Sequence, residues 1–260
     1  MGAETAEVYA ALLTPLSGDG GVDMDALRAH CRSLVAAGVD GVLVAGTTGE
    51  GPLLGDDEVV RAVSAVAGET RVLAHVGRPS TPATVELARR ALDAGADEVS
   101  VVVPYYYELG DEQVLAHFSA VAEAVSPVLA YVIPARTVND VSTELLDRLA
   151  DAGVVGVKDS TKSLERHEEY LAVARRRPGF RVYMGSDGLA VDALERGATG
   201  LISAVANVRP ELVVALRDGA YELAQELLAV RAAAGGLAGL KRLVAERIEG
   251  YPVGVRAPLG

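Results

Sequence analysis

Tryptophan is absent from this 260-residue sequence, phenylalanine occurs twice, and cysteine occurs once, at Cys31. A lone cysteine excludes an internal disulfide, so we expect a reducing compartment and a small buried side chain at this position. Aromatic residues make up only 4% of the chain, although 50% of it is hydrophobic. The core should therefore consist mainly of Ala, Val and Leu, which is typical of helices packed on parallel strands.

Long hydrophobic runs are also missing. No stretch approaches the roughly 18 apolar residues of a membrane span, and residues 1–10 show no charged leader followed by an apolar core. Ala6 stands where N-myristoylation of Gly2 would require Ser or Thr, so no lipid anchor is expected. The sequence predicts a cytoplasmic protein.

Basic residues are few, with 24 Lys and Arg against 36 Asp and Glu, which gives a formal charge of −12. They are scattered along the chain except at Arg175–Arg177, which ends a predicted helix and is typical of a solvated last turn. Without a basic stripe, neither nucleic acid nor an anionic membrane is an expected partner.

Eight short apolar runs alternate with eight helical patterns up to about residue 218. The runs are nearly continuous in apolar residues, as in parallel strands that are covered on both faces. The predicted strands are 8–13, 41–46, 71–76, 98–103, 127–133, 154–159, 181–185 and 200–205. The predicted helices are 23–37, 55–67, 79–94, 111–124, 142–152, 163–176, 188–196 and 209–218. Because no linker interrupts the series, it predicts a closed (β/α)8 TIM barrel and not a doubly wound sheet.

The remaining residues form a tail that is too small to be a domain of its own. Residues 220–247 are rich in Ala and Leu and predict one or two helices, interrupted at Gly235-Gly236. We therefore divide the chain into a barrel domain, 1–218, and a short helical extension, 219–260.

In a barrel of this kind the active centre lies at the carboxyl ends of the strands, so polar residues that follow each run are the candidates. They are Thr47–Glu50 after the second strand, Tyr105–Tyr107 after the fourth, Tyr131 and Arg136 at the fifth, Lys158–Ser160 at the sixth, Gly185–Asp187 at the seventh, and Ser203 and Asn207 at the eighth.

Lys158 ends the apolar segment VVGVKDS. An apolar setting favours the uncharged amine, which condenses with a ketone to an imine that then serves as an electron sink. Asp159 need not contact the lysine, because adjacent strand residues point to opposite faces. The alternative that the local sequence leaves open is an ordinary strand-end lysine paired with a surface acid.

Imine chemistry also requires a proton shuttle. Tyr131 stands one strand away from Lys158, and the hydroxyls of Thr47 and Tyr106 could relay its protons to water. Thr48-Gly49 offers hydroxyl and backbone N–H groups suited to a carboxylate. A core tyrosine and an ordinary glycine turn remain the alternatives for Tyr131 and for this segment.

The four histidines, His30, His75, His117 and His167, show no ligand-like spacing to each other or to paired carboxylates. The sequence therefore disfavours a metal-dependent aldol mechanism, and no metal site is predicted.

Together the segments TTGEGPLL, VVVPYYY, YVIPART and VVGVKDS resemble the dihydrodipicolinate synthase / N-acetylneuraminate lyase family of class I aldolases. ALLTPLSGDGGVD, MGSD and GATGLISAVANV resemble it too, so the match extends over about residues 8–256. Order and spacing are preserved throughout, which makes the joint resemblance specific.

The resemblance implies that Lys158 forms an imine with pyruvate or another 2-oxo acid and that Tyr131 is the acid/base phenol. Thr47 and Tyr106 would complete the proton relay, with Tyr106 reaching in from a neighbouring subunit. Thr48 and Gly49 would hold the keto-acid carboxylate. No cofactor beyond the substrate imine is implied.

Arg136 falls where the synthases of the family place an arginine that meets the carboxylate of aspartate semialdehyde, a task that suits a guanidinium. Gly185 and Ser203 are further predicted substrate-binding residues. The resemblance thus favours condensation of pyruvate with aspartate semialdehyde, a step of lysine biosynthesis, by a homo-oligomer that is either a dimer or a tetramer. Small molecules are the only other expected partners.

Three departures from the family pattern concern the second substrate and the subunit contact: Val132 replaces Asn, HVGRPSTP follows the third strand, and Gly51-Pro52 follows Glu50. The short extension also puts the usual tetramer in doubt. One alternative is an aldolase or dehydratase for a 2-oxo-3-deoxy sugar acid, and another is a catalytically silent metabolite-binding barrel. A phosphate- or flavin-binding barrel, suggested by glycines expected to begin turns at Gly185 and Gly200, ranks last.

Overall fold

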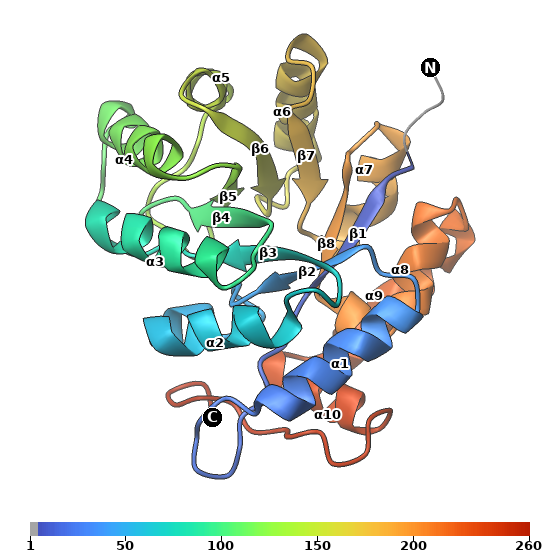
Figure 1. Cartoon of the computed structure of the whole chain (residues 1–260). Coiled ribbons are helices and arrows are strands. Elements are labelled where there is room, and N and C mark those ends of the chain that lie inside the picture. The colour runs from blue at the N-terminus through green and yellow to red at the C-terminus, as the bar shows by residue number, and fades with distance from the viewer. Residues whose placement is uncertain (1–4) are drawn as a thin grey trace.

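Eight parallel strands close into a barrel in the order in which they occur in the chain (Figure 1). The computed structural model describes residues 5–260. The strands are β1 (Glu7–Ala11), β2 (Gly41–Val44), β3 (Arg71–His75), β4 (Glu98–Val102), β5 (Val128–Val132), β6 (Val154–Asp159), β7 (Arg181–Met184) and β8 (Gly200–Ser203). Each strand pairs with its sequence neighbours, and β1 pairs with β8. The predicted TIM barrel is confirmed.

Helices follow the strands and surround the barrel (Figure 1). Side chains at Asp23, Ser80, Ser142 and Ser163 accept a hydrogen bond from the first turn of the helix that follows, which fixes where these helices begin. The α-helices are α1 (Met24–Ala36), α2 (Asp56–Val66), α3 (Thr81–Asp93), α4 (Asp111–Ala124), α5 (Thr143–Asp151), α6 (Leu164–Arg176), α7 (Ala190–Glu195), α8 (Pro210–Arg217), α9 (Ala224–Ala234) and α10 (Leu237–Ala245).

Four 3-10 turns complete the described elements. They are η1 (Gly51–Leu53), η2 (Asp187–Leu189), η3 (Val205–Asn207) and η4 (Tyr221–Leu223). The predicted helix 188–196 is therefore divided between η2 and α7, and the predicted strand 8–13 lies at 7–11. Gly235 ends α9 in the left-handed conformation, with φ 64°, which confirms the predicted interruption of the tail.

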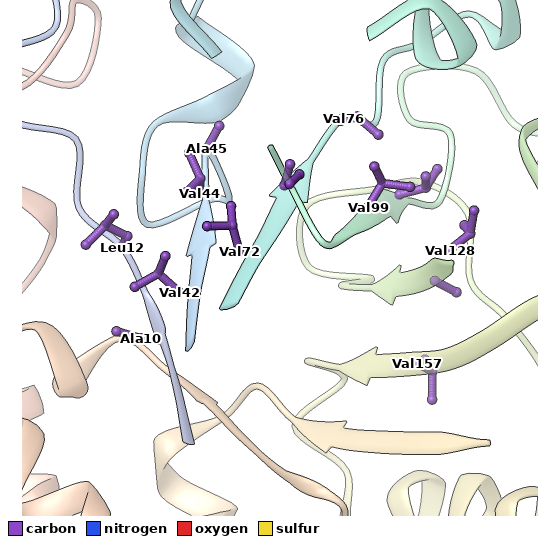
Figure 2. Packing of buried hydrophobic residues seen from close by; sticks show 14 of the residues in the cluster. Ala10, Leu12, Val42, Val44, Ala45, Val72, Val76, Val99, Val128 and Val157 are labelled. Atoms are coloured by element: carbon purple, nitrogen blue, oxygen red, sulfur yellow. The ribbon is translucent and has the colours of Figure 1, made fainter. Parts of the chain in front are cut away.

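The larger core lies between the barrel and its helices and is built almost entirely of Val, Ala and Leu (Figure 2). Cys31 is one of its buried members, as predicted. A separate cluster fills the inside of the barrel, where alternate residues of the strands point inward. Its residues are Tyr9, Ala11, Leu43, Leu73, Leu129, Tyr183 and Ile202.

The prediction that Gly200 begins a turn after the eighth strand is wrong. Gly200 is the first residue of β8, at the amino end of the barrel, and a Cβ there would lie 2.1 Å from the carbonyl oxygen of Glu7. Its lack of a side chain therefore serves the close approach of β8 to β1, away from the expected site.

The extension packs across the carboxyl end of the barrel. Leu240, Val244 and Tyr251 form a third cluster with Leu13 and Val208, which follow β1 and η3. Helix α9 also contacts η2 and η3, the turns after β7 and β8. No helix within residues 5–260 is long and apolar enough to cross a membrane.

Candidate active site

Lys158 and Tyr131 are brought together by strand register. They are register partners on β6 and β5, and the Lys158 Nζ lies 4.2 Å from the centroid of the Tyr131 ring. Lys158 is 4% exposed and Tyr131 2% exposed. Lys158 forms no ion pair with any carboxylate of residues 5–260. The alternative of a surface lysine paired with an acid is therefore wrong.

Asp159 lies on the opposite face of β6, as strand alternation predicts. Its Oδ2 lies 2.9 Å from Nδ1 of His167 on α6, and its Oδ1 accepts hydrogen bonds from the backbone and hydroxyl of Thr161. Asp159 and His167 are both fully buried. The carboxylate thus fixes the loop after β6 and leaves Lys158 alone inside the barrel.

The Tyr131 phenol is hydrogen-bonded to the hydroxyl of Thr47, with 3.1 Å between the two oxygens. Thr47 is half-buried and lines the cavity described below, so the pair leads from the buried phenol toward solvent. His75 packs edge-on against the Tyr131 ring at 5.7 Å between centroids. Burial, assisted by Arg78 and Lys158, lowers the pKa of His75 to about 3, so its ring is neutral at pH 7.

Thr48 and Gly49 continue the turn that carries Thr47. Thr48 lines the cavity, whereas Gly49 is buried against the segment that follows β1, where a Cβ would lie 2.7 Å from the carbonyl oxygen of Leu12. The backbone N–H groups of Thr48 and Gly49 donate no hydrogen bond to any group within residues 5–260. Both N–H groups are therefore unpaired within the described residues, and that of Thr48 belongs to a residue that borders the cavity.

Gly185 gives Lys158 the room it occupies. A Cβ at Gly185 would lie 2.2 Å from the Ser160 hydroxyl and 2.9 Å from Lys158 Cε. Ser203, the other residue predicted to bind substrate on this side, instead donates its hydroxyl to the Asp187 carboxylate. Burial raises the pKa of Asp187.

A cavity of about 580 Å³ opens above these residues at the carboxyl end of the barrel. Thr47, Thr48, Tyr131, Lys158 and Gly185 line it. Its wall also carries Arg136, Lys162, Asp187 and Arg231. With Lys158 these groups supply four basic side chains against one acidic one, which suits a substrate with negative charge.

Sequence reasoning did not assign Lys162, Asp187 or Arg231 to the site. Asp187 was noted only as a strand-end residue, and Lys162 follows the sixth strand by three positions. Arg231 lies on α9 of the extension, so only the docking of that helix brings it to the barrel mouth. No local pattern in the sequence signals that contact.

Arg136 lies on the loop after β5 and forms no ion pair with a carboxylate of residues 5–260. It lines both the large cavity and a neighbouring one of about 310 Å³. The second cavity is mainly apolar and lies beside Thr47, with Leu53, Ile133 and Leu259 in its wall.

Tyr106 is the one predicted proton-relay residue that does not reach the site in its own chain. It is 79% exposed, with φ 85°, and stacks edge-on against Tyr107, which is 69% exposed. Asn139 braces this loop by hydrogen bonds to the carbonyls of Pro104 and Tyr107. A buried side chain therefore braces the backbone of the loop that carries the two exposed rings.

The expectation that Val132 shapes the aldehyde pocket is wrong. Val132 is fully buried in the outer core between the barrel and its helices, because it alternates with Tyr131. In the HVGRPS loop, Arg78 bonds to Asp56 on α2, and only His75 lines a cavity, the smaller one. The loop is thus tied to α2, and its residues after His75 line neither of the two cavities.

A buried lysine held over a phenol that is itself hydrogen-bonded to a hydroxyl, at the carboxyl end of a (β/α)8 barrel, defines an enzyme of the class I aldolase type. The chain belongs to the dihydrodipicolinate synthetase family, whose model matches residues 4–233. Enzymes of this family hold pyruvate as a Schiff base on a lysine and need no external cofactor. They act on small molecules and are typically oligomeric.

Relatives of known sequence agree with this assignment. An uncharacterized DapA-like lyase of Halobacterium salinarum is 41% identical over 96% of this chain and 82% of its own length. A 4-hydroxy-tetrahydrodipicolinate synthase of Dechloromonas aromatica is 39% identical over 84% of this chain and 77% of its own length.

Solved structures show the same architecture. YagE, a prophage protein of the dihydrodipicolinic acid synthase family from E. coli K12 in complex with pyruvate, matches with TM-score 0.92 and 29% identity over 98% of this chain and 93% of that one. The KD(P)GA of T. tenax matches with TM-score 0.87 and 33% identity over 97% and 92%.

Proposed function

We propose that the protein joins pyruvate, held as an imine on Lys158, to an aldehyde that carries a carboxylate, and that aspartate semialdehyde is the leading acceptor. The observation that carries the proposal is the Lys158–Tyr131–Thr47 arrangement, with Arg136 unpaired in the same cavity. Relatives named 4-hydroxy-tetrahydrodipicolinate synthase, at 38–41% identity, support this choice of acceptor.

The chemistry follows from the positions of the groups. The Lys158 amine attacks the ketone carbon of pyruvate, and water leaves as the imine forms. Tyr131 transfers the protons of this step and exchanges them through Thr47 with solvent. Loss of a methyl proton gives an enamine, whose carbon forms the new bond to the aldehyde carbon while the aldehyde oxygen is protonated.

The keto-acid carboxylate is proposed to bind at Thr48 and Gly49, whose backbone N–H groups are unused. Arg136 would then receive the carboxylate of the acceptor, because a guanidinium offers two parallel donors to the two oxygens. Gly185 contributes space for Lys158, and Ser203 acts through Asp187.

We further propose that Tyr106 completes the relay of a second copy of the chain. Its ring and that of Tyr107 are exposed hydrophobic groups on a braced loop, which is typical of an interface. The apolar cavity beside Thr47, of about 310 Å³, supports this arrangement because it offers a partner's ring a place next to the phenol relay. The enzyme would then be at least a dimer with two-fold symmetry.

A second candidate reaction is cleavage or dehydration of a 2-oxo-3-deoxy sugar acid. The large cavity favours this reaction because Lys162, Asp187 and Arg231 also line it. A short semialdehyde is too small to contact all three of these polar side chains. The KD(P)GA of T. tenax, at 33% identity, supports it as well. The catalytically silent alternative is not retained, since Val132, one of its two supports, lies outside both cavities.

Turnover assays with each substrate decide between the two reactions. We expect condensation of pyruvate with aspartate semialdehyde, and we expect Arg136→Ala to lower it at least about 100-fold while pyruvate adduct formation persists. Arg148→Ala, which breaks an exposed ion pair with Glu112, is the control. If the wild type cleaves 2-oxo-3-deoxygluconate and does not condense the semialdehyde, the sugar-acid reaction replaces our leading proposal.

A further inference from the structure

The loop that carries Thr47 is held in a strained conformation. Ala45 has φ 55° and Glu50 has φ 60°, values in the left-handed region that residues other than glycine rarely adopt. Such strain persists only where surrounding contacts enforce it. The turn between these two residues contains Thr47, Thr48 and Gly49, so whatever enforces the strain also determines where these groups lie.

The conformation of Glu50 is held by contacts with the C-terminal part of the chain. Its Oε1 lies 2.5 Å from Nζ of Lys241 on α10, and both side chains are fully buried. Its Oε2 accepts a hydrogen bond of 2.6 Å from the backbone N–H of Arg256. Lys241 also donates to the carbonyl of Gly254, at 2.6 Å. One buried carboxylate thus connects the loop after β2 with α10 and with the terminal segment.

A buried ion pair is a poor device for stability alone, because the cost of removing two charges from water offsets much of their attraction. It does impose one geometry, since each buried charge is also bound by the terminal segment: Glu50 accepts from the backbone N–H of Arg256, and Lys241 donates to the carbonyl of Gly254. Burial lowers the pKa of Lys241 while the adjacent Glu50 opposes that shift. The pair therefore acts as a fixed connection between two segments that are about 190 residues apart, a separation typical of tertiary and not local constraints.

We propose that Glu50 and Lys241 are positioning residues of the active site, whose ion pair holds Thr47 against the Tyr131 phenol and so makes the C-terminal extension part of the catalytic machinery. The inference rests on the proposed function, because it assigns the Thr47–Tyr131 hydrogen bond to proton transfer. It goes beyond that function in requiring residues that touch neither substrate nor the reacting atoms.

The chain offers a matched control on the same terminal segment. Glu58 binds the Arg256 guanidinium, with 2.6 Å between its Oε2 and Nη1, and also accepts from the N–H of Gly55 at the start of α2. None of the hydrogen bonds and ion pairs that Glu58 forms within residues 5–260 reaches the Thr47–Gly49 turn. Glu58→Gln therefore loosens the terminal segment without releasing the turn.

Two measurements distinguish a role of the ion pair in positioning Thr47 from a purely structural role. Pyruvate adduct formation, trapped with borohydride and read as intact mass, reports Lys158. Exchange of pyruvate methyl protons for deuterium, read by NMR, reports proton transfer on the imine. We expect Glu50→Gln to keep the adduct and the KM for pyruvate while slowing exchange about 10- to 100-fold, the effect of a small displacement of a catalytic group.

Because Lys241→Met leaves the Glu50 charge buried without a partner, the double variant Glu50→Gln/Lys241→Met, which buries no charge, is the second test. It should fold and form the adduct, yet exchange as slowly as Glu50→Gln. Wild-type exchange in both variants, or an equal loss in Glu58→Gln, would reduce the pair to a structural support and overturn this inference alone. No adduct in the wild type would overturn both this inference and the proposed function.

Discussion

Lys158 and Tyr131 face each other across adjacent strands, with Nζ 4.2 Å from the ring centroid and the phenol oxygen 3.1 Å from the Thr47 hydroxyl. The ring and the hydroxyl therefore serve different purposes. The face of the ring packs against the amine, and the hydroxyl is the only part of the Tyr131 side chain that can move a proton.

Replacing Tyr131 with Phe should separate these purposes. The ring remains, so the borohydride-trapped pyruvate adduct should still form on Lys158. Turnover should fall by about 100- to 10,000-fold, the usual contribution of a general acid or base. Tyr170→Phe is the control, because that tyrosine is buried outside the barrel and donates to the carbonyl of Val141. Unchanged turnover in Tyr131→Phe would remove the phenol from the reaction.

Gly185→Ala should slow the reaction of Lys158 although the lysine itself is unchanged. The added Cβ would lie 2.2 Å from the Ser160 hydroxyl and 2.9 Å from Lys158 Cε, so one of these groups has to move. We expect the rate of adduct formation to drop by about 100-fold, because small displacements of reacting groups have effects of that order. Gly188→Ala, three residues further on, adds a Cβ that would meet only the Leu228 and Ser186 side chains, at an ordinary contact distance of 3.9 Å, and should behave as the wild type. Equal rates in the two variants would contradict this role of Gly185.

Mixing two inactive variants tests whether Tyr106 acts across an interface. Tyr131→Phe and Tyr106→Ala are each expected to be inactive on their own. In a two-fold hybrid dimer, the subunit with Tyr106→Ala keeps its own Tyr131 and receives an intact Tyr106 from its partner. Remixing the subunits should therefore restore part of the activity. No recovery, with hybrids verified by mass, would mean that Tyr106 does not act in trans.

Stability should depend on pH through buried histidines. Burial lowers the pKa of His30 to about 4, while an unfolded histidine titrates near 6.5. Between these values the unfolded chain binds more protons, so the free energy of unfolding is highest above pH 6.5 and falls as the pH drops toward 4. Through this difference in pKa, His30 should contribute about 3 kcal/mol to the free energy of unfolding at neutral pH.

His30→Gln should flatten this dependence, because glutamine does not titrate. Urea unfolding at pH 7 and at pH 4.5 measures the two free energies. Some pH dependence should remain, since burial also lowers the pKa of His75 to about 3 and of His117 to about 4. If the free energy of unfolding changes by the same amount between the two pH values in the wild type and in His30→Gln, His30 does not contribute to the pH dependence.

The barrel was predictable from sequence because strands covered on both faces leave runs of Val, Ala and Leu with little else. Strand order then placed Lys158 next to Tyr131 on the adjacent strands β6 and β5. Closure of the sheet brings Thr47, which follows β2, to the Tyr131 phenol across the barrel mouth. The same alternation rule that separates Lys158 from Asp159 also separates Tyr131 from Val132. Applied consistently, it would have removed Val132 from the pocket.

The contributions of the extension were not predictable. Arg231 reaches the cavity, and Lys241 reaches Glu50, only because α9 and α10 dock across the barrel mouth. That docking depends on a cluster formed by residues as distant as Leu13 and Tyr251, which no periodic pattern relates to each other. Long-range packing of this kind leaves no local mark in the sequence.

The central claim, that Lys158 forms an imine with a 2-oxo acid, is tested most directly by incubating the protein with pyruvate, reducing with borohydride and measuring intact mass. We predict a gain equal to pyruvic acid less one oxygen atom, located on Lys158 by peptide mapping and absent from Lys158→Ala. No gain in the wild type with pyruvate or any other 2-oxo acid, or an undiminished gain in Lys158→Ala, would contradict the account.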